Sequence, residues 1–271
     1  MKSVCIGDMK LEVPIIQGGM GVGISLGNLA GHVAKNGGMG VISTAHPGYR
    51  AEDFEKNPTE VNKRELAKEI QKAKEIAKGK GMVAINAMVA ITDYAQMVEV
   101  AIKNKIDAII SGAGLPMNLP GFVKGTKVKI APIVSSGKAA RLICKTWDRR
   151  YHVAPDFVVI EGSEAGGHLG FHKEDVLNKT TAKLADIFKE VKETLQPFVE
   201  KYQKEIPIFV AGGVYDADDI KQFMDLGADG VQMATRFICT EECDADIKYK
   251  EAFINAKKED IEIVKSRVGM P

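Results

Sequence analysis

The segment Phe157–Gly170 carries the residue types best suited to chemistry in this chain. Its sequence, FVVIEGSEAGGHLG, is an apolar run that leads directly into two carboxylates, four glycines and a histidine. Glycine lets the backbone approach a ligand closely and reach positive φ without steric cost. Histidine exchanges protons near neutrality, because its unperturbed pKa is about 6.5. His168 is therefore a candidate acid or base, and the competing interpretation of this segment alone is a flexible glycine turn with a solvated histidine.

The rest of the chain offers no second set of catalytic residue types. His32 lies in a helical segment, and no serine or cysteine lies in a nucleophile elbow. Cys239 and Cys243 are four residues apart and share a helical face, but no second pair of ligands lies nearby, so we predict no metal site. The remaining histidines lie in polar connections or long loops; they are His46, His152 and His172. The expected chemistry is thus one acid or base acting on a bound ligand.

Eight short apolar runs alternate with helix-period segments along the whole chain. This alternation is typical of a parallel sheet that is buried on both faces. Eight such units predict one domain over residues 1–271, a closed (β/α)8 TIM barrel, with an open doubly wound sheet as the alternative. The predicted strands are Pro14–Gln17, Gly40–Thr44, Met82–Met88, Ala108–Ser111, Ile130–Ser135, Phe157–Glu161, Ile208–Ala211 and Val231–Ala234.

Several local patterns support this architecture. Three predicted strands are preceded by an aspartate, at Asp107, Asp156 and Asp229. Two connections, Ala45–Lys63 after strand two and Ser163–Lys183 after strand six, are long enough to form a lid. Apolar residues at helical spacing predict helices around Leu66, Ile70, Ala73 and Ala77, over Tyr94–Ile102 and over Asp216–Leu226. Thr92 or Asp93 is the expected N-cap of the second of these, and Gly227 is the expected end of the third. The fifth helix is prolonged through Lys145–Tyr151, where Trp147 is expected to be a packing or interface residue.

Most predicted strands end in glycine or in a polar residue. In a barrel these ends meet the loops that bind ligands. Gly212 and Gly213 after strand seven, with Met233–Thr235 after strand eight, predict a phosphate site formed by free backbone N–H groups and the Thr235 hydroxyl. Asn86 is polar within an apolar strand, so its amide needs either a heterocyclic ligand or the backbone of a neighbouring strand. Arg236 remains unassigned.

Composition narrows the class of partner. The formal net charge of +1 provides no basic field for nucleic acid. No apolar run approaches the roughly 20 residues of a membrane span, and the N-terminus lacks a signal-peptide core. Four scattered cysteines are typical of reduced thiols. We expect a cytoplasmic protein that acts on a small molecule, with no nucleic-acid or membrane partner and a homodimer as the default assembly.

Six segments at the strand ends form an ordered set. They are Pro14-Ile-Ile-Gln-Gly-Gly-Met20, Ala84-Ile-Asn-Ala-Met88, Ser111-Gly-Ala-Gly114, Glu161-Gly-Ser-Glu-Ala-Gly-Gly-His168, Phe209-Val-Ala-Gly-Gly213 and Gln232-Met-Ala-Thr-Arg-Phe237. Together they resemble the nitronate monooxygenase family, formerly called 2-nitropropane dioxygenase, which includes the similar flavin-dependent enoyl-ACP reductase II. Because they run from residue 14 to residue 237, the resemblance covers nearly the whole chain.

The resemblance implies an FMN-bearing TIM barrel. His168 matches the family's catalytic histidine, which would stabilise an anionic nitronate or remove an α-proton from a neutral nitroalkane. Electron transfer to FMN and reaction with O2 would then give a carbonyl compound and nitrite. The implied cofactor contacts are Gly212, Gly213, Met233, Ala234 and Thr235 for the phosphate, Gly19, Met20, Gly21 and Asn86 for the flavin and ribityl chain, and Gly166 and Gly167 close to the flavin.

Three departures and three competing hypotheses accompany this resemblance. Ala234 stands where many relatives have glycine, the Ala45–Lys63 and Lys145–Tyr151 segments are longer than expected, and a short C-terminal segment is expected to be missing after Pro271. NAD(P)H-dependent enoyl-ACP reduction shares the flavin site, so its substrate would be an enoyl thioester instead of an alkyl nitronate. The second competing hypothesis is a flavin-free barrel lyase or synthase for sugar phosphates, and the third is a flavin-binding protein without turnover.

Overall fold

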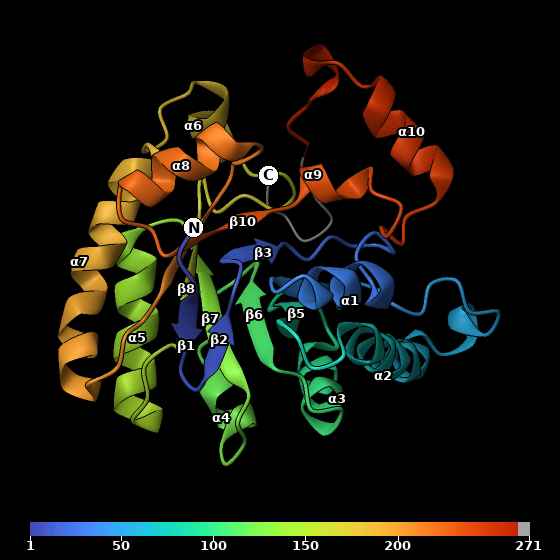
Figure 1. Ribbon diagram of the computed structural model, residues 1–271, viewed down its shortest axis with the longest axis horizontal. Helices are drawn as coiled ribbons and strands as arrows, with labels where there is room; N and C mark the ends of the chain where they lie inside the picture. The colour runs from blue at the N-terminus through green and yellow to red at the C-terminus, as the bar shows by residue number, and fades with distance from the viewer. Residues whose placement is uncertain (265–271) are drawn as a thin grey trace.

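The computed structural model describes residues 1–264 and shows a closed barrel of eight parallel strands (Figure 1). The strands follow one another in chain order, and the last pairs with the first. Each lies within one residue of its predicted bounds, so the TIM barrel is confirmed and the open sheet is wrong. The barrel strands are β3 (Ile15–Gln17), β4 (Met39–Ser43), β5 (Met82–Met88), β6 (Ala108–Gly112), β7 (Lys129–Val134), β8 (Val158–Glu161), β9 (Ile208–Ala211) and β10 (Gly230–Met233).

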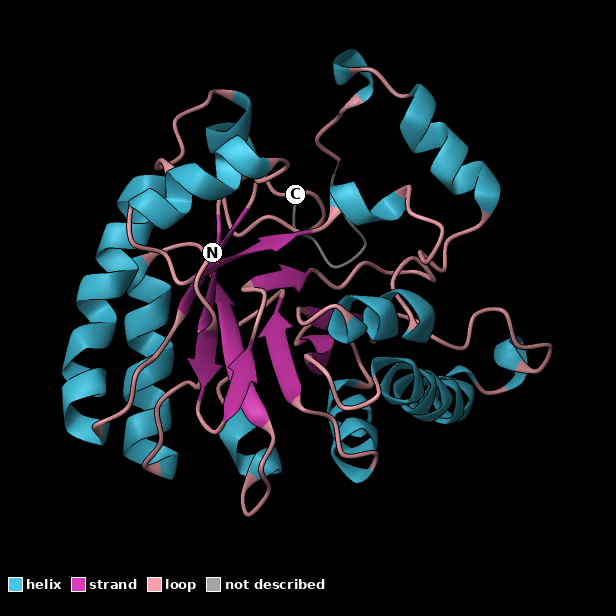
Figure 2. Ribbon diagram, viewed as in Figure 1, coloured by secondary structure: helices cyan, strands magenta, loops and turns pink. Residues whose placement is uncertain are grey.

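Helices surround the barrel on its outer side (Figure 2). Helices α1 and α2 lie together on one flank, and α5 and α7 lie together on another. The last helix, α10, extends away from the barrel, and none of its residues is buried. The helices are α1 (Gly27–Lys35), α2 (Pro58–Ala77), α3 (Tyr94–Lys103), α4 (Leu119–Val123), α5 (Gly137–Tyr151), α6 (Lys173–Leu177), α7 (Leu184–Tyr202), α8 (Ala217–Asp225), α9 (Thr235–Ile238) and α10 (Ile247–Asn255), with short 3-10 helices at Phe54–Lys56 and Lys258–Asp260.

The core forms two layers because successive residues of a strand point to opposite sides of the sheet. In β8, Val159 belongs to the cluster inside the barrel, whereas Val158 and Ile160 belong to the layer between strands and helices. Inside the barrel the rings of Phe157 and Phe209 meet edge-on, with centroids 5.7 Å apart. This alternation decides which strand residues can reach a ligand at the barrel mouth.

A short N-terminal hairpin was not predicted from the sequence. Its strands are β1 (Val4–Ile6) and β2 (Met9–Leu11), and the turn between them uses Gly7 at a φ of +60°. Ile6 and Leu11 are fully buried in the interior cluster. Asp8 also forms an ion pair with Lys129, the first residue of β7. The hairpin therefore closes the end of the barrel at which the strands begin.

The three aspartates that lead into β6, β8 and β10 make the same contact. The N–H of each aspartate donates to the carbonyl of a residue in the preceding strand, and its carboxylate accepts the N–H of that same residue. We call this arrangement the Asp clasp. The pairs are Asp107 with Val83, Asp156 with Ile130 and Asp229 with Ile208, each with a carboxylate-to-nitrogen distance of 2.8 Å. The repeated aspartates noted in the sequence thus fix neighbouring strands to one another.

Two local expectations were wrong. The connection expected to run to Lys63 ends earlier, because α2 begins at Pro58 and the Asn57 side chain accepts the N–H of Glu60. An Asn-Pro pair suits a helix start as well as a turn, since proline lacks an N–H that the first helical position does not need. Asp93 precedes α3 as expected but makes no capping hydrogen bond through its side chain.

Two more expectations concern the Trp147 helix and the second long loop. Trp147 lies within the single helix α5, is fully buried, and donates from its indole Nε1 to the carbonyl of Pro116 at 2.9 Å. Its packing role is confirmed. The Ser163–Lys183 connection contains α6, and its action as a lid stays a prediction. No helix of residues 1–264 combines the length and apolarity needed to cross a bilayer.

Candidate active site

The ends of the eight parallel strands meet in one rim, where the predicted site residues lie. The loop after β3 crosses this rim against β5 and β10. A Cβ added to Gly19 would lie 2.4 Å from the Cβ of Asn86, and one added to Gly18 would lie 3.4 Å from the Gln232 side chain. Glycine at position 19 is therefore what lets this loop lie on Asn86. The structure brings together Gly19 and Asn86, which come from separate sequence segments.

The loops after β8 and β9 also touch each other. Gly212 has a φ of +93°, and a Cβ there would lie 3.0 Å from the backbone nitrogen of Ala165. Gly213 has a φ of +79°, and a Cβ there would lie 2.5 Å from a carboxylate oxygen of Glu164. Both positions require glycine for conformation and for space. The predicted phosphate loop therefore lies directly beside the loop that carries His168.

Gly166 and Gly167 differ from these glycines because they face open space. A Cβ added to either one would meet no atom within 4 Å. The protein's own contacts therefore do not require a missing side chain there, and room remains over the backbone for a ligand. His168 follows them and is only partly buried. The hydrogen bonds of residues 1–264 include none to its imidazole, so both ring nitrogens are available to a ligand.

Three polar side chains turn into the barrel just below the rim. Glu161 and Gln232 both pair in register with Ala211, which belongs to the interior cluster. Residues that pair in neighbouring parallel strands share a face, so both side chains point inward. Asn86 pairs in the same way with the interior residue Ile110. Asn86, Glu161 and Gln232 therefore form a polar layer beneath the glycine loops.

This polar layer lacks internal partners. Gln232 Oε1 is buried and has no hydrogen-bond partner, and within the described residues no other buried side-chain N or O atom is in that state. A buried acceptor left unpaired costs about 1–3 kcal/mol. Glu161 also makes no hydrogen bond there, and burial raises the pKa of its carboxyl to about 7, because loss of water penalises the charged form. The Asn86 amide likewise makes none, so the alternative of a bond to a neighbouring strand backbone is not found.

Two predicted contacts are backbone positions only. The Met20 N–H donates to Ser25 Oγ at 2.8 Å, and its side chain packs against a cluster that includes Ile24. The Met233 side chain belongs to the outer layer, and its carbonyl accepts the N–H of Gly18. Neither side chain turns toward the mouth, because burial in other clusters is more favourable for an apolar group.

The remaining predicted residues lie at the rim surface. Gly21 and Thr235 are exposed, and Ala234 immediately precedes α9. The unassigned Arg236 stacks its guanidinium over the exposed ring of Tyr215, 4.9 Å from the centroid.

The two cysteines considered as metal ligands have separate contacts. Cys239 Sγ lies 3.8 Å from the carbonyl oxygen of Lys250, whereas Cys243 Sγ lies 3.2 Å from that of Ile24. One thiol is exposed and the other is buried. Each therefore has its own backbone acceptor, and the pair does not form the centre of a ligand set.

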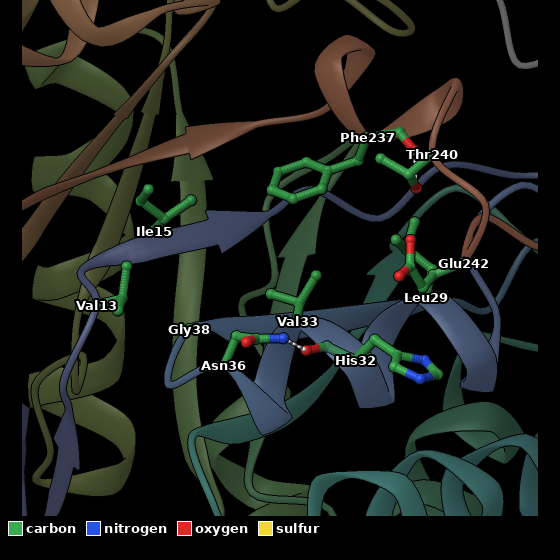
Figure 3. Close-up of a pocket in the computed structure, with 10 residues that line it drawn as sticks. All are labelled: Val13, Ile15, Leu29, His32, Val33, Asn36, Gly38, Phe237, Thr240 and Glu242. Carbon is green, nitrogen blue, oxygen red and sulfur yellow. Dashed lines mark hydrogen bonds between the residues drawn. The ribbon is translucent and has the colours of Figure 1, made fainter.

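A separate cavity of about 280 Å³ lies outside the barrel, between α1 and the segment that follows β10 (Figure 3). Val13, Leu29, Val33 and Phe237 give it a largely apolar wall. It exists because α9 ends at Ile238, too early to cover the outer side of β3. None of the predicted site residues lines it.

Comparison with known proteins identifies the family. The family model described as nitronate monooxygenase matches residues 2–271, and the chain belongs to this family. It is 35% identical over 116 residues to a probable nitronate monooxygenase of Staphylococcus saprophyticus, covering 43% of this chain and 30% of that protein. It is 24% identical over 261 residues to a (3aS,4S,5R,7aS)-5-hydroxy-7a-methyl-1-oxo-octahydro-1H-indene-4-carboxyl-CoA dehydrogenase of Rhodococcus jostii, covering 96% of this chain and 62% of that one.

Solved structures show the same fold. FabK from Thermotoga maritima superposes with a TM-score of 0.68 at 27% identity, covering 91% of this chain and 65% of that chain. A nitroalkane oxidase from Streptomyces ansochromogenes superposes with a TM-score of 0.67 at 20% identity, covering 89% and 70%. This chain thus spans less than two thirds of the curated relatives' length and about two thirds of these solved chains. The family predicted from six sequence segments is confirmed.

The rim fits a flavin mononucleotide in three respects. Gln232 Oε1 needs a hydrogen-bond donor, and the flavin ring carries one at N3. Gly166 and Gly167 leave space over the backbone for a flat ring. Gly212 and Gly213 place two successive positive-φ residues at one loop, a conformation that exposes backbone N–H groups to an anion.

Two members of the polar layer had no role assigned from the sequence. Glu161 and Gln232 lay inside the recognised segments, but an apolar run that is buried on both faces does not show which residues turn inward. For Glu161, counting alternate residues forward from Phe157 and Val159 was the available signal, but it required knowing from the strand register that these two residues face the barrel interior.

Proposed function

We propose that this chain is an FMN-dependent oxidoreductase that oxidises alkyl nitronates with O2 to carbonyl compounds and nitrite. The observation that carries the proposal is the position of His168, directly after two glycines at which an added Cβ would meet no atom within 4 Å. A ring bound on these glycines would lie next to the imidazole. Family membership over residues 2–271 and the similarity to nitronate monooxygenases support the same activity.

His168 supplies the acid or base chemistry. A neutral imidazole removes the α-proton of a nitroalkane, and the resulting imidazolium donates a hydrogen bond to the anionic nitronate. With a preformed nitronate as substrate, the histidine acts as the anion stabiliser alone. Its lack of internal hydrogen bonds leaves both ring nitrogens free for these tasks.

The remaining site residues hold the cofactor. Gly212 and Gly213, with Ala234 and Thr235, take the FMN phosphate, and Asn86 and Gln232 bind polar edges of the flavin or its ribityl chain. Bound FMN supplies the electron acceptor that the protein's side chains lack. The further predicted contacts, made through backbone or by close approach, are Gly19, Met20, Gly21, Gly166, Gly167 and Met233.

A second candidate is NAD(P)H-dependent reduction of an enoyl thioester. The 24% identity to a carboxyl-CoA dehydrogenase over 96% of this chain and 62% of that protein supports it, because the substrate of that enzyme is a thioester of coenzyme A. Both activities use the same rim, because each needs a flavin and one acid or base. The substrate therefore has to be found by experiment.

Anaerobic reduction of the FMN-loaded protein tests both candidates. Bleaching of the flavin absorbance by ethylnitronate or 2-nitropropane, with no bleaching by NADH or NADPH, is the expected result. Rapid bleaching by NADH or NADPH alone would replace nitronate oxidation with enoyl reduction. A protein that binds no FMN would contradict both and would favour a flavin-free barrel enzyme.

A further inference from the structure

Glu161 is an ionisable side chain that turns into the barrel at the level of the cofactor loops. It is the last residue of β8, and its register partner Ala211 lies in the interior cluster. Gln232 pairs with the opposite side of Ala211, so Glu161 and Gln232 belong to one row of register partners across β8, β9 and β10 and point to the same face. Two strand spacings correspond to about 10 Å. A ligand that reaches Gln232 Oε1 therefore lies within the same polar layer as the Glu161 carboxyl.

Within residues 1–264, no lysine, arginine or histidine forms an ion pair with Glu161. The elements packed against β8 are β7, β9 and α7. Ser135, the residue that follows β7, has its Oγ against Gly170, and β9 presents Ala211 as the register partner of Glu161. The Lys129 ammonium of β7 is at the far end of the barrel, where it pairs with Asp8. Charged side chains of α7 lie outside the strands.

The loop that follows β8 contributes two titratable groups, Glu164 and His168. The Glu164 carboxylate lies over Gly213, on the β9 side. Neither group shifts the pKa of Glu161, for which burial is the sole cause of the rise to about 7. Within residues 1–264, the inward-facing Glu161 carboxyl therefore has no hydrogen bond or ion pair that would favour one charge state, and burial raises its pKa.

The two charge states of Glu161 offer different contacts to a cofactor. A neutral carboxyl donates an O–H hydrogen bond, whereas an ionised one only accepts. The flavin ring and the ribityl chain carry several acceptor oxygens, and the FMN phosphate is an anion. An ionised Glu161 would lose its donor and place a negative charge, unpaired with any cation of residues 1–264, beside an anionic ligand.

We propose that Glu161 is a proton-dependent positioning residue, which holds FMN only while its carboxyl carries a proton. Above neutral pH, binding of FMN then takes up one proton. This inference rests on the proposed function, because it requires that the chain binds FMN. It adds to that function an upper pH limit for FMN binding, which depends on a side chain of the protein and not on the chemistry of the substrate.

The test compares the FMN dissociation constant of the wild type with that of Glu161→Gln between about pH 6 and about pH 9. The amide mimics the neutral acid and cannot ionise. We expect the wild-type constant to rise toward about tenfold per pH unit above neutrality, while the ratio of wild type to variant is flat below it. Titration of the FMN phosphate is common to both proteins and cancels in this ratio. Parallel curves for the two proteins overturn the inference.

Two further measurements keep the test decisive. Calorimetry of FMN binding to the wild type at about pH 8, in two buffers of different ionisation enthalpy, should show uptake of close to one proton, and no uptake overturns the inference even when the variant does not fold. Glu174→Gln removes an exposed carboxylate of α6 and should reproduce the wild-type curve. FMN binding with no pH effect contradicts the role of Glu161 alone, whereas no FMN binding at any pH contradicts the proposed function as well.

Discussion

The two ends of the barrel treat polar groups in opposite ways. Where strands begin, the Asp clasps pair each carboxylate with a backbone N–H at 2.8 Å, and Lys74 and Lys204 add ion pairs to two of them. Where strands end, Asn86, Glu161 and Gln232 turn inward and make no side-chain hydrogen bond within the described chain. The first arrangement stabilises the fold, and the second leaves donors and acceptors for a ligand.

This difference indicates which polar residues have a role in ligand binding and which have a role in folding. A buried polar group normally finds a partner within the protein, because leaving it unpaired costs free energy. Unpaired groups that gather at one rim, beside glycines open to solvent, indicate a place where a ligand completes the hydrogen bonds. Substitutions at the strand starts should therefore change stability, and substitutions at the strand ends should change binding or turnover.

The largest expected effect is on turnover. His168→Ala should lower kcat/KM for a neutral nitroalkane about 10²- to 10⁴-fold, because it removes the base. Bound FMN, measured by its absorbance, and the unfolding midpoint should stay as in the wild type. A variant that keeps FMN and full activity on every substrate tried would show that this end of the barrel binds a flavin without catalysing through His168.

The next effect is the dependence of apoprotein stability on pH. The pKa of Glu161 rises from 4.5 to about 7 on folding, so the folded state holds the proton more tightly. The sign follows: below pH 4.5 both states are protonated and no penalty exists, and stability is lost progressively as pH rises through 7. The loss approaches about 3 kcal/mol.

Urea unfolding of the apoprotein at several pH values measures this loss. Glu161→Gln should remove this part of the pH dependence, with the variant more stable than the wild type at about pH 8 and similar to it at about pH 4. If the free energy of unfolding depended on pH in the same way for both apoproteins, the Glu161 carboxyl would have a partner within the fold. The two ends of the barrel would then not differ in how they pair their carboxylates.

At the strand starts, Asp156→Ala should lower the free energy of unfolding by about 2 kcal/mol, because it removes the bond to the Ile130 N–H and the ion pair with Lys204. FMN affinity of the folded protein should not change. Asp225→Ala, which breaks an exposed ion pair with Lys221 in α8, is the matched control and should have little effect. Weaker FMN binding by Asp156→Ala, under conditions in which the variant is fully folded, would contradict the assignment of the strand starts to stability alone.

A pair of glutamines tests the comparison within neighbouring strands. Gln232→Leu should stabilise the apoprotein by about 1 kcal/mol, because it removes an unpaired buried acceptor, and should weaken FMN binding. Gln17→Leu should destabilise it, since the Gln17 amide accepts from the Val41 N–H at 3.0 Å and donates to the Val41 carbonyl at 3.3 Å. Equal stability changes in the two variants would contradict the assignment of Gln232 to a ligand.

The smallest effect on the apoprotein is expected at Gly166. Gly166→Ala should change the free energy of unfolding by no more than about 0.5 kcal/mol, because the added methyl group meets no atom. It should still weaken FMN binding, which fluorescence titration measures. Gly19→Ala should instead destabilise the apoprotein, since its methyl group would overlap with Asn86. An unchanged FMN affinity in Gly166→Ala would place the ring elsewhere.

The barrel was predictable from the sequence to a large extent, because its strands are bounded by Asp, Pro and Gly residues with local roles. The N-terminal hairpin was missed, although Gly7-Asp8 between the short segments Val4–Ile6 and Met9–Leu11 was a usable turn signal. Each of its strands has only three residues, too few to show alternation. Ser163–Lys183 was predictable only as a long connection, since its helix α6 has no buried face.

The candidate site was predictable in its glycines and in His168, whose spacing is visible along the chain. Glu161 and Gln232 received no role because their neighbours in these doubly buried strands are apolar on both faces. The sequence therefore does not show which face of the strand points into the barrel, and only the strand register does so. Met20 and Met233 show the reverse case, in which a residue inside a recognised segment turns its side chain into another cluster.

The Asp clasps have a consequence for how this scaffold can diversify. Each one locks the alignment of two adjacent strands before the chain reaches the opposite rim, so insertions or deletions in an exit loop do not shift the neighbouring units. Residues 163–183 can thus be lengthened, shortened or exchanged as a unit. The same barrel can acquire new substrate-binding loops in evolution while its strand pairing stays unchanged.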